Sequence, residues 1–442
     1  MKRIAITTLG CKINQFESAS FQSEFELRGC ALVAFGQPAD VIVINTCTVT
    51  GKAGAQSRQL IRKAARTSPG AKIVITGCHA QMAAQELIDM EELRDSQVCI
   101  VGNGNKHLLV DTALQEKSCD LSMLMGKILR KTEICPLPVR RFNDRTRAFL
   151  RVQDGCNSYC TYCIVPYTRG PSRSLAAGEV LRQAEIFAGE GHKEIVVTGI
   201  HTGMYGRDLK EGKDIAALLQ ELCAATPGVR YRLSSIEPLE IQPELLRLMA
   251  ERSNFMPHLH IPLQSGDDEI LSRMNRRYRT SDFAAIVNTC LRDIPDAAIG
   301  IDVLVGFPGE TERHFANTES FLRDLACTYL HVFPYSKRPG TVASTLKEQV
   351  AKAVKDERVA RLRALGEQKK AAFYSRHLGT RRQVLVEGKR DSKGMLKGFT
   401  DNYIPVCLPG DETMINTLVL VELQEISDTN VIGKHIQGCN ES

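Results

Sequence analysis

The 442-residue sequence predicts an α/β protein in three parts: an N-terminal open parallel sheet, a partial (β/α)6 barrel and a small C-terminal β-barrel. Two stretches alternate β-branched strands with helical patterns, which is typical of parallel sheets. A charged helix is expected at 347–377, and short strands punctuated by glycine and proline follow it, which favours a small closed barrel. We expect domains at 1–125, 142–375 and 376–442.

In the first part, strands are expected at 4–8, 41–44, 72–76 and 98–101, with helices near 14–28, 52–66 and 80–90. Each of the first three strands is followed by a cysteine: Cys11, Cys47 and Cys78. Ligands of open α/β sheets gather at the carboxyl ends of strands. The pattern therefore favours a three-thiolate cluster here, although a single buried cysteine would be ordinary core.

In the second part, strands are expected at 148–153, 194–198, 230–234, 258–262, 299–305 and 329–333, with helices between them. Six such units in sequence indicate an incomplete parallel barrel. Active sites of barrels lie at the carboxyl ends of their strands. We therefore expect chemistry on that rim, where the residues after each strand are polar or glycine.

A cysteine triplet follows the first barrel strand: Cys156, Cys160 and Cys163. Three thiolates at this spacing suit an iron–sulfur cluster with one iron left free for a small molecule. One alternative is a buried helical stripe, but glycine, asparagine, serine and threonine separate the cysteines. Another is zinc, which usually takes four ligands, and no fourth cysteine or histidine lies nearby in the sequence.

The distribution of charge and the spacing of the cysteines further limit which kinds of protein fit the sequence. The net charge is +6, and residues 127–151 carry eight Lys/Arg against two acidic groups, with further basic clusters at 273–279 and 352–382. These clusters favour a polyanionic partner such as RNA over ordinary solvated faces. Fifteen irregularly spaced cysteines indicate reduced thiols and a cytoplasmic location. No segment has the length of a membrane helix.

The triplet, with Tyr162 before its last cysteine, resembles the signature of radical S-adenosylmethionine (SAM) enzymes. Together with Cys11, Cys47 and Cys78, the chain is similar to the methylthiotransferase family of these enzymes, and its C-terminal module resembles the RNA-binding TRAM domain. Residues 8–15 (TLGCKINQ), 153–174 and 198–203 (TGIHTG) most resemble the branch acting on tRNA N6-threonylcarbamoyladenosine beside the anticodon.

The resemblance implies two [4Fe-4S] clusters, one on each cysteine triad, and SAM as cofactor and methyl donor. The cluster of Cys156, Cys160 and Cys163 would generate a radical that takes hydrogen from C2 of adenine, and methylated sulfur would join that carbon. Expected cofactor contacts are Tyr162, Gly199, Ser235, Gln264 and Gly306. Expected partners are the tRNA anticodon stem-loop and an electron donor of the flavodoxin or ferredoxin type.

Three alternatives remain open at this point. The substrate could be N6-isopentenyladenosine in tRNA or an aspartate of a ribosomal protein, or the chain could be a noncatalytic iron–sulfur RNA-binding protein. His258 and His260 share one face of a strand and could be metal ligands. We interpret them as hydrogen-bonded groups of the barrel lumen.

Overall fold

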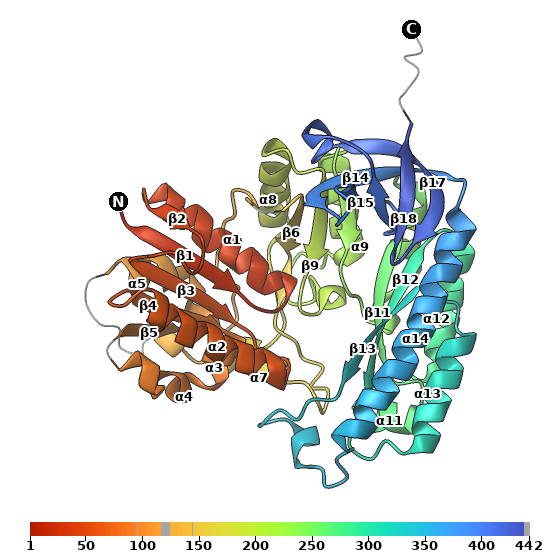
Figure 1. Cartoon of the computed structure of the whole chain (residues 1–442). Helices are drawn as coiled ribbons and strands as arrows, with labels where there is room; N and C mark the ends of the chain where they lie inside the picture. The colour runs from red at the N-terminus through yellow and green to blue at the C-terminus, as the bar shows by residue number, and fades with distance from the viewer. Residues whose placement is uncertain (95, 116–123, 144, 437–442) are drawn as a thin grey trace.

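The computed structural model describes residues 1–94, 96–115, 124–143 and 145–436. Figure 1 shows three bodies: the N-terminal sheet in red and orange, the barrel in green, and the C-terminal β-barrel in blue. These bodies agree with the predicted fold class. The exact domain boundaries stay a prediction. Within the described residues, no helix combines the length and the apolar character that crossing a membrane requires.

The N-terminal body is a five-stranded parallel sheet in the order β2-β1-β3-β4-β5. Its strands are β1 (Arg3–Thr8), β2 (Ala31–Val33), β3 (Val41–Thr46), β4 (Lys72–Gly77) and β5 (Gln97–Val101). β3 and β4 are buried along their whole length, which explains their continuous β-branched sequences. α1 (Lys12–Leu27) and α5 (Leu109–Leu114) cover one face, and α2 (Gly51–Thr67), α3 (Cys78–Met82) and α4 (Ala84–Ile88) cover the other.

The barrel consists of two three-stranded parallel sheets, ordered β6-β9-β10 and β11-β12-β13. Isolated parallel bridges from Ser235 to His260 and from Tyr231 to Phe255 connect them. The strands are β6 (Arg147–Arg151), β9 (Glu194–Thr198), β10 (Arg230–Leu233), β11 (His258–Gln264), β12 (Ala298–Val305) and β13 (Tyr329–Pro334). The helices are α8 (Ala177–Gly189), α9 (Ile215–Ala225), α10 (Pro243–Glu251), α11 (Asp268–Arg273), α12 (Thr280–Asp293) and α13 (Glu312–Asp324). All six strands lie where the sequence predicts them.

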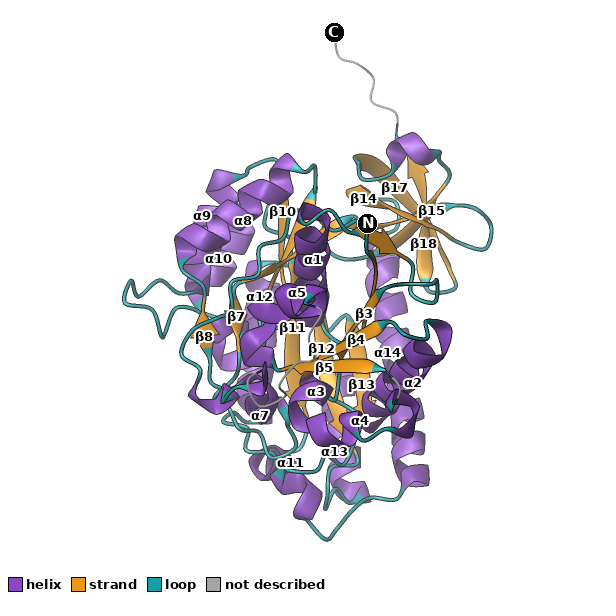
Figure 2. Ribbon diagram, turned by 90° about the vertical axis from the view of Figure 1, so that its left-hand side faces the viewer, coloured by secondary structure: helices purple, strands orange, loops and turns teal. Residues whose placement is uncertain are grey.

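The C-terminal body begins after α14 (Lys352–His377), which packs along β13 and α13 (Figure 1). Its closed barrel has the order β14-β15-β16-β18-β17. The strands are β14 (Arg381–Arg390), β15 (Leu396–Thr400), β16 (Pro405–Leu408), β17 (Leu418–Ser427) and β18 (Asn430–His435). Figure 2 shows this barrel resting on the end of the larger one. Arg232 fixes the junction by donating to the carbonyl oxygen of Asp401 at 2.9 Å.

Candidate functional site

The first candidate centre lies at one edge of the N-terminal sheet. β1, β3 and β4 are adjacent and parallel, so their carboxyl ends meet there. Cys11 follows β1 and caps α1, Cys47 follows β3, and Cys78 begins α3 directly after β4. Electrostatic interactions couple Cys11 and Cys47 to Cys78. The fold thus brings the three thiols together, as the strand-end pattern led us to expect.

Two glycines make this close approach possible. Gly10 and Gly77 each precede one of the cysteines, and each has a φ of +96°. A Cβ atom on Gly10 would lie 2.7 Å from Cys47 Sγ, and one on Gly77 would lie 2.2 Å from the carbonyl oxygen of Thr46. Only glycine therefore fits where the chain turns from strand to cysteine.

The second candidate centre is the cysteine loop between β7 (Gln153–Asp154) and α7 (Val165–Arg169). Each of its first two sulfur atoms has a polar neighbour from elsewhere in the barrel. His201 Nδ1 lies 3.4 Å from Cys156 Sγ, and Arg276 Nη1 donates to Cys160 Sγ at 3.4 Å. Burial raises the pKa of the Cys163 thiol to about 12. Burial also disfavours the Cys156 thiolate, but hydrogen bonds with His201 and Ser158 lower the pKa of Cys156 overall.

The distances between the sulfur atoms of each triad distinguish a site for an iron–sulfur cluster from a site for a single metal ion. Around one tetrahedral zinc ion, sulfur ligands at about 2.3 Å from the metal lie about 3.8 Å apart. Among the described residues, neither cysteine triad brings its three sulfur atoms within 4.8 Å of one another. Cysteines that bind different irons of one cluster lie farther apart. The donor chemistry and spacing of both triads therefore fit an iron–sulfur cluster better than zinc.

The expected cofactor contacts lie on the same rim as the cysteine loop. Gly199, Ser235 and Gly306 follow β9, β10 and β12, and Gln264 ends β11 with a φ of +73°. The Gly306 N–H donates to Glu310 at 2.8 Å. Tyr162 packs against a small apolar cluster that includes Phe307 and Tyr335. Their roles as cofactor ligands stay a prediction.

Two ion pairs at this rim were not predicted from the sequence. His201 Nε2 lies 2.8 Å from Glu240 Oε1, and Arg276 is paired with Glu237. Burial disfavours protonated His201, yet its contacts with Cys156 and Glu240 raise its pKa to about 10. His201 belongs to a segment that the resemblance used, whereas nothing in the sequence marks the two glutamates.

A buried network of charges joins the two centres. Arg169, at the end of α7, is 1% exposed and donates to Asp154 Oδ1 at 3.0 Å within the barrel. Across the junction it donates to Glu17 Oε1 at 3.1 Å and to Asn14 Oδ1 at 2.6 Å, both on α1. Lys106 is also paired with Glu17. The helix after Cys11 and the helix after Cys163 are therefore held together by buried, charge-assisted hydrogen bonds.

The histidines of β11 are hydrogen-bonded lumen groups, as predicted. The Tyr329 hydroxyl lies 2.7 Å from His258 Nε2 and 3.3 Å from His260 Nδ1. His260 Nε2 is also 2.8 Å from Asp302 Oδ1 on β12, and His331 of β13 lies 3.6 Å from the same oxygen.

Family models match two parts of the chain. Residues 150–322 match the radical SAM superfamily, and residues 3–99 match uncharacterized protein family UPF0004. Among solved structures, the radical S-adenosylmethionine methyltransferase TsrM from Kitasatospora setae, with cobalamin and a [4Fe-4S] cluster bound, has a TM-score of 0.55 at 14% identity. The match covers 78% of this chain and 77% of that one. Fold and site thus define a radical SAM protein.

Full-length relatives narrow this class. The chain is 40% identical over 430 residues to threonylcarbamoyladenosine tRNA methylthiotransferase MtaB of Bacillus subtilis, covering 96% of this chain and 94% of that protein. It is 32% identical to tRNA-2-methylthio-N(6)-dimethylallyladenosine synthase of Fusobacterium nucleatum, covering 98% and 100%. The chain belongs to the radical SAM tRNA methylthiotransferase family. Enzymes of this family bind SAM and a [4Fe-4S] cluster and carry a second cluster.

Proposed function

We propose that this protein attaches a methylthio group to C2 of N6-threonylcarbamoyladenosine in the anticodon stem-loop of tRNA. The observation that carries the proposal is the pair of cysteine triads, one at the carboxyl ends of three parallel strands and one in the loop after β7, joined through Arg169. The substrate is favoured by 40% and 37% identity to two threonylcarbamoyladenosine enzymes, against 32% to a dimethylallyladenosine enzyme.

The residues fit the cofactors in the following way. Cys156, Cys160 and Cys163 would hold the cluster that binds SAM, and Cys11, Cys47 and Cys78 would hold the second one. When bound, these groups supply the one-electron chemistry that an unactivated aromatic C–H bond requires. Arg276 and His201 place donors against the sulfur atoms of Cys160 and Cys156, and such donors stabilise thiolate charge. Glu237 and Glu240 offer carboxylates on the same rim for the amino group of SAM.

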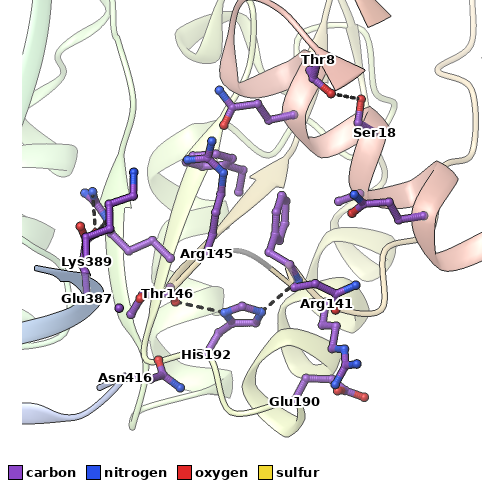
Figure 3. Close-up of a pocket in the computed structure, with 18 of the residues that line it drawn as sticks. Thr8, Ser18, Arg141, Arg145, Thr146, Glu190, His192, Glu387, Lys389 and Asn416 are labelled. Carbon is purple, nitrogen blue, oxygen red and sulfur yellow. Dashed lines mark hydrogen bonds and ion pairs between the residues drawn. The ribbon is translucent and has the colours of Figure 1, made fainter. Parts of the chain in front are cut away.

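A basic cleft supports the RNA part of the proposal. It has a volume of about 1050 Å³ and lies between α1, the segment before β6 and the C-terminal barrel (Figure 3). Its lining includes Arg141, Arg145, Arg147 and Lys389, against Glu190 and Glu387. Lysine and arginine bind the phosphate backbone without reading sequence. A stem-loop held in this cleft would contact all three bodies of the protein.

Two further parts of the proposal concern the cell. An electron donor of the flavodoxin or ferredoxin type would reduce the barrel cluster, and the cytoplasm would supply tRNA and reducing conditions. Reduction of the reconstituted protein by purified flavodoxin and by purified ferredoxin, followed by SAM cleavage, tests the donor. Cleavage with neither protein, but with a chemical reductant, would contradict that choice.

The proposed reaction is tested by mass spectrometry of tRNA nucleosides from cells with and without the gene. Loss of the 2-methylthio form, with its unthiolated threonylcarbamoyl precursor accumulating, is the expected result. Loss of the methylthio dimethylallyl nucleoside instead would assign the protein to the sister reaction. Unchanged tRNA would refute the proposal.

Variants test the two centres separately. Cys160→Ala should abolish SAM cleavage by the purified protein, because it removes a ligand of the SAM-binding cluster. Cys47→Ala should leave SAM cleavage and stop formation of the methylthio product. Cys30→Ala is the control, since Cys30 is a free cysteine outside both triads. Product formation by Cys47→Ala would show that the second centre has another role.

A further inference from the structure

Lys12 stands next to Cys11 and faces the junction of the three bodies. It is the first residue of α1, whose first turn lines a cleft through Gln15 together with Arg147 of β6. The negative charge of Asp302 on β12 acts on its ammonium group, and the positive charge of Arg147 opposes that effect. Lys12 is solvent-exposed, and within the described part of the chain its ammonium group forms no hydrogen bond or ion pair. A cation in such a junction is available to an anionic ligand.

Asp302 presents the opposite charge to the same space. Both of its ion pairs use Oδ1: His260 Nε2 at 2.8 Å and His331 Nδ1 at 3.6 Å. Its second oxygen, Oδ2, has no hydrogen bond among the described residues. His260 is in turn fixed by the Tyr329 hydroxyl, so the orientation of the Asp302 carboxylate is set by its neighbours. Lys12 and Asp302 therefore offer one free cation and one free hydrogen-bond acceptor.

The surroundings explain why the other cations of this junction are not available in the same way. Arg147 is paired with Glu387 at 3.0 Å and lies over the ring of Phe399 at 4.7 Å. Arg232 is paired with Glu194 at 2.9 Å and lies over the ring of Tyr403 at 4.8 Å. Lys12 is the cation of this group that forms no hydrogen bond and no ion pair with the described residues, although the charge of Asp302 acts on it.

We propose that Lys12 binds the carboxylate of the threonylcarbamoyl group of the substrate and that Asp302 accepts a hydrogen bond from its hydroxyl or N–H group. This inference rests on the proposed function. In the proposed reaction the centre of Cys11, Cys47 and Cys78 would supply the sulfur that joins C2, so the base would approach the residue beside Cys11. The threonyl group carries an anion next to hydrogen-bond donors, which matches the two free groups.

The same pair of charges argues against two other ligands. A dimethylallyl group is hydrocarbon, and covering an ammonium and a carboxylate with it would remove their hydration without compensation. An RNA phosphate would suit Lys12, but it carries no hydrogen-bond donor for Asp302, so that acceptor would stay unpaired. The pair therefore selects a substituent with both an anion and a donor.

The test measures binding of anticodon stem-loops to the reconstituted protein by fluorescence anisotropy without oxygen. One RNA carries threonylcarbamoyladenosine and the other carries unmodified adenosine. Lys12→Met should weaken binding of the modified RNA by about ten- to a hundredfold, the usual loss for a charge-assisted hydrogen bond, and leave the unmodified RNA unchanged. Lys12→Arg should retain most of the affinity. Arg292→Met, which removes a cation that is 72% exposed and lies outside the basic clusters, is the control.

The outcomes separate this inference from the proposed function. Equal weakening for both RNAs would show that Lys12 binds a phosphate, and it would overturn the assignment. Unchanged binding of the modified RNA by Lys12→Met, in a wild-type protein that prefers this RNA, would overturn it too. A wild-type protein that neither prefers nor converts the modified RNA would instead refute the proposed function. His260, Asp302 and His331 offer three ligand atoms within 4.8 Å of one another. A divalent ion retained by the wild type and lost in His331→Ala would therefore overturn the role of Asp302 as a hydrogen-bond acceptor.

Discussion

Arg169 offers the sharpest test of how the two centres are held together. Its guanidinium group is 1% exposed and contacts Glu17, Asp154 and Asn14 at 3.1, 3.0 and 2.6 Å. Removal of one partner from a buried ion pair costs about 3–5 kcal/mol, because the charges that remain have lost their compensation. Arg169→Met keeps much of the side-chain volume and removes the charge. We expect it to lower the free energy of unfolding by about that amount.

The control is Arg313→Met. Arg313 is 72% exposed and paired with Glu269 at 3.2 Å, and such surface pairs contribute at most about 1 kcal/mol. Both variants are compared by urea unfolding of the reduced apoprotein, followed by circular dichroism. Because a chain with several domains need not unfold in one step, hydrogen exchange of α1 and α7 locates the loss. If Arg169→Met costs no more than the control, the network does not hold the bodies together as argued.

The pH dependence of the folding stability tests the same network of buried charges in a second way. Burial disfavours ionised Glu17, but Arg169 and Lys106 lower its pKa below the ordinary value of 4.5. A carboxyl group with a lowered pKa stabilises the fold above its unfolded pKa, and this contribution is lost as the pH falls toward the folded value. Wild-type stability should therefore fall as the pH drops below 4.5, and Glu17→Gln should show a smaller acid-side decline. Parallel pH profiles for the two proteins would contradict this assignment.

Three further outcomes follow from the geometry. Gly77→Ala should lower stability by about 1–3 kcal/mol and reduce iron bound by the N-terminal centre, because its Cβ would lie 2.2 Å from the Thr46 oxygen at a φ of +96°. Gly178→Ala in α8 meets nothing within 4 Å and should be neutral or stabilising, so equal losses would contradict the steric argument. Lys389→Met should weaken tRNA binding and reduce the slope of log affinity against log salt by about one, and an unchanged slope would remove Lys389 from the RNA contact.

The sequence predicted the strands better than the elements around them. All six barrel strands and four strands of the N-terminal sheet were found from runs of β-branched residues, since parallel strands are buried on both faces. β2 (Ala31–Val33) was missed because three residues form too short a pattern. In the C-terminal module the sequence predicts strands at 383–386, 403–408, 418–423 and 431–435 but not β15 (Leu396–Thr400), because Lys397 and Gly398 interrupt its pattern. Glycine is nevertheless needed at Gly398, where a Cβ would lie 2.5 Å from the Leu385 oxygen.

The candidate site was predictable where its residues follow a local rule. The cysteines stand at strand ends or at close spacing, so their neighbourhood could be inferred from topology. Arg169 could not be found this way, because its partner Glu17 lies 152 positions away and nothing near either residue marks the contact. Glu237 and Glu240 were missed for the same reason: their partners come from other loops of the rim.

Arg169 connects the two cysteine centres through only a few hydrogen bonds, and this short connection matters for the proposed chemistry. Asn14, which accepts one of its hydrogen bonds, donates to the carbonyl oxygens of Leu9 and Thr46, and these two residues directly precede Gly10-Cys11 and Cys47. On the barrel side, the Cys156 N–H donates to the carbonyl oxygen of Gly170, the residue after Arg169. Arg169 is thus tied to the first centre through the side chain of Asn14 and to the second through the backbone of Gly170. The separation of the two centres is then set by buried hydrogen bonds, which favours a reaction that needs both centres at one carbon atom.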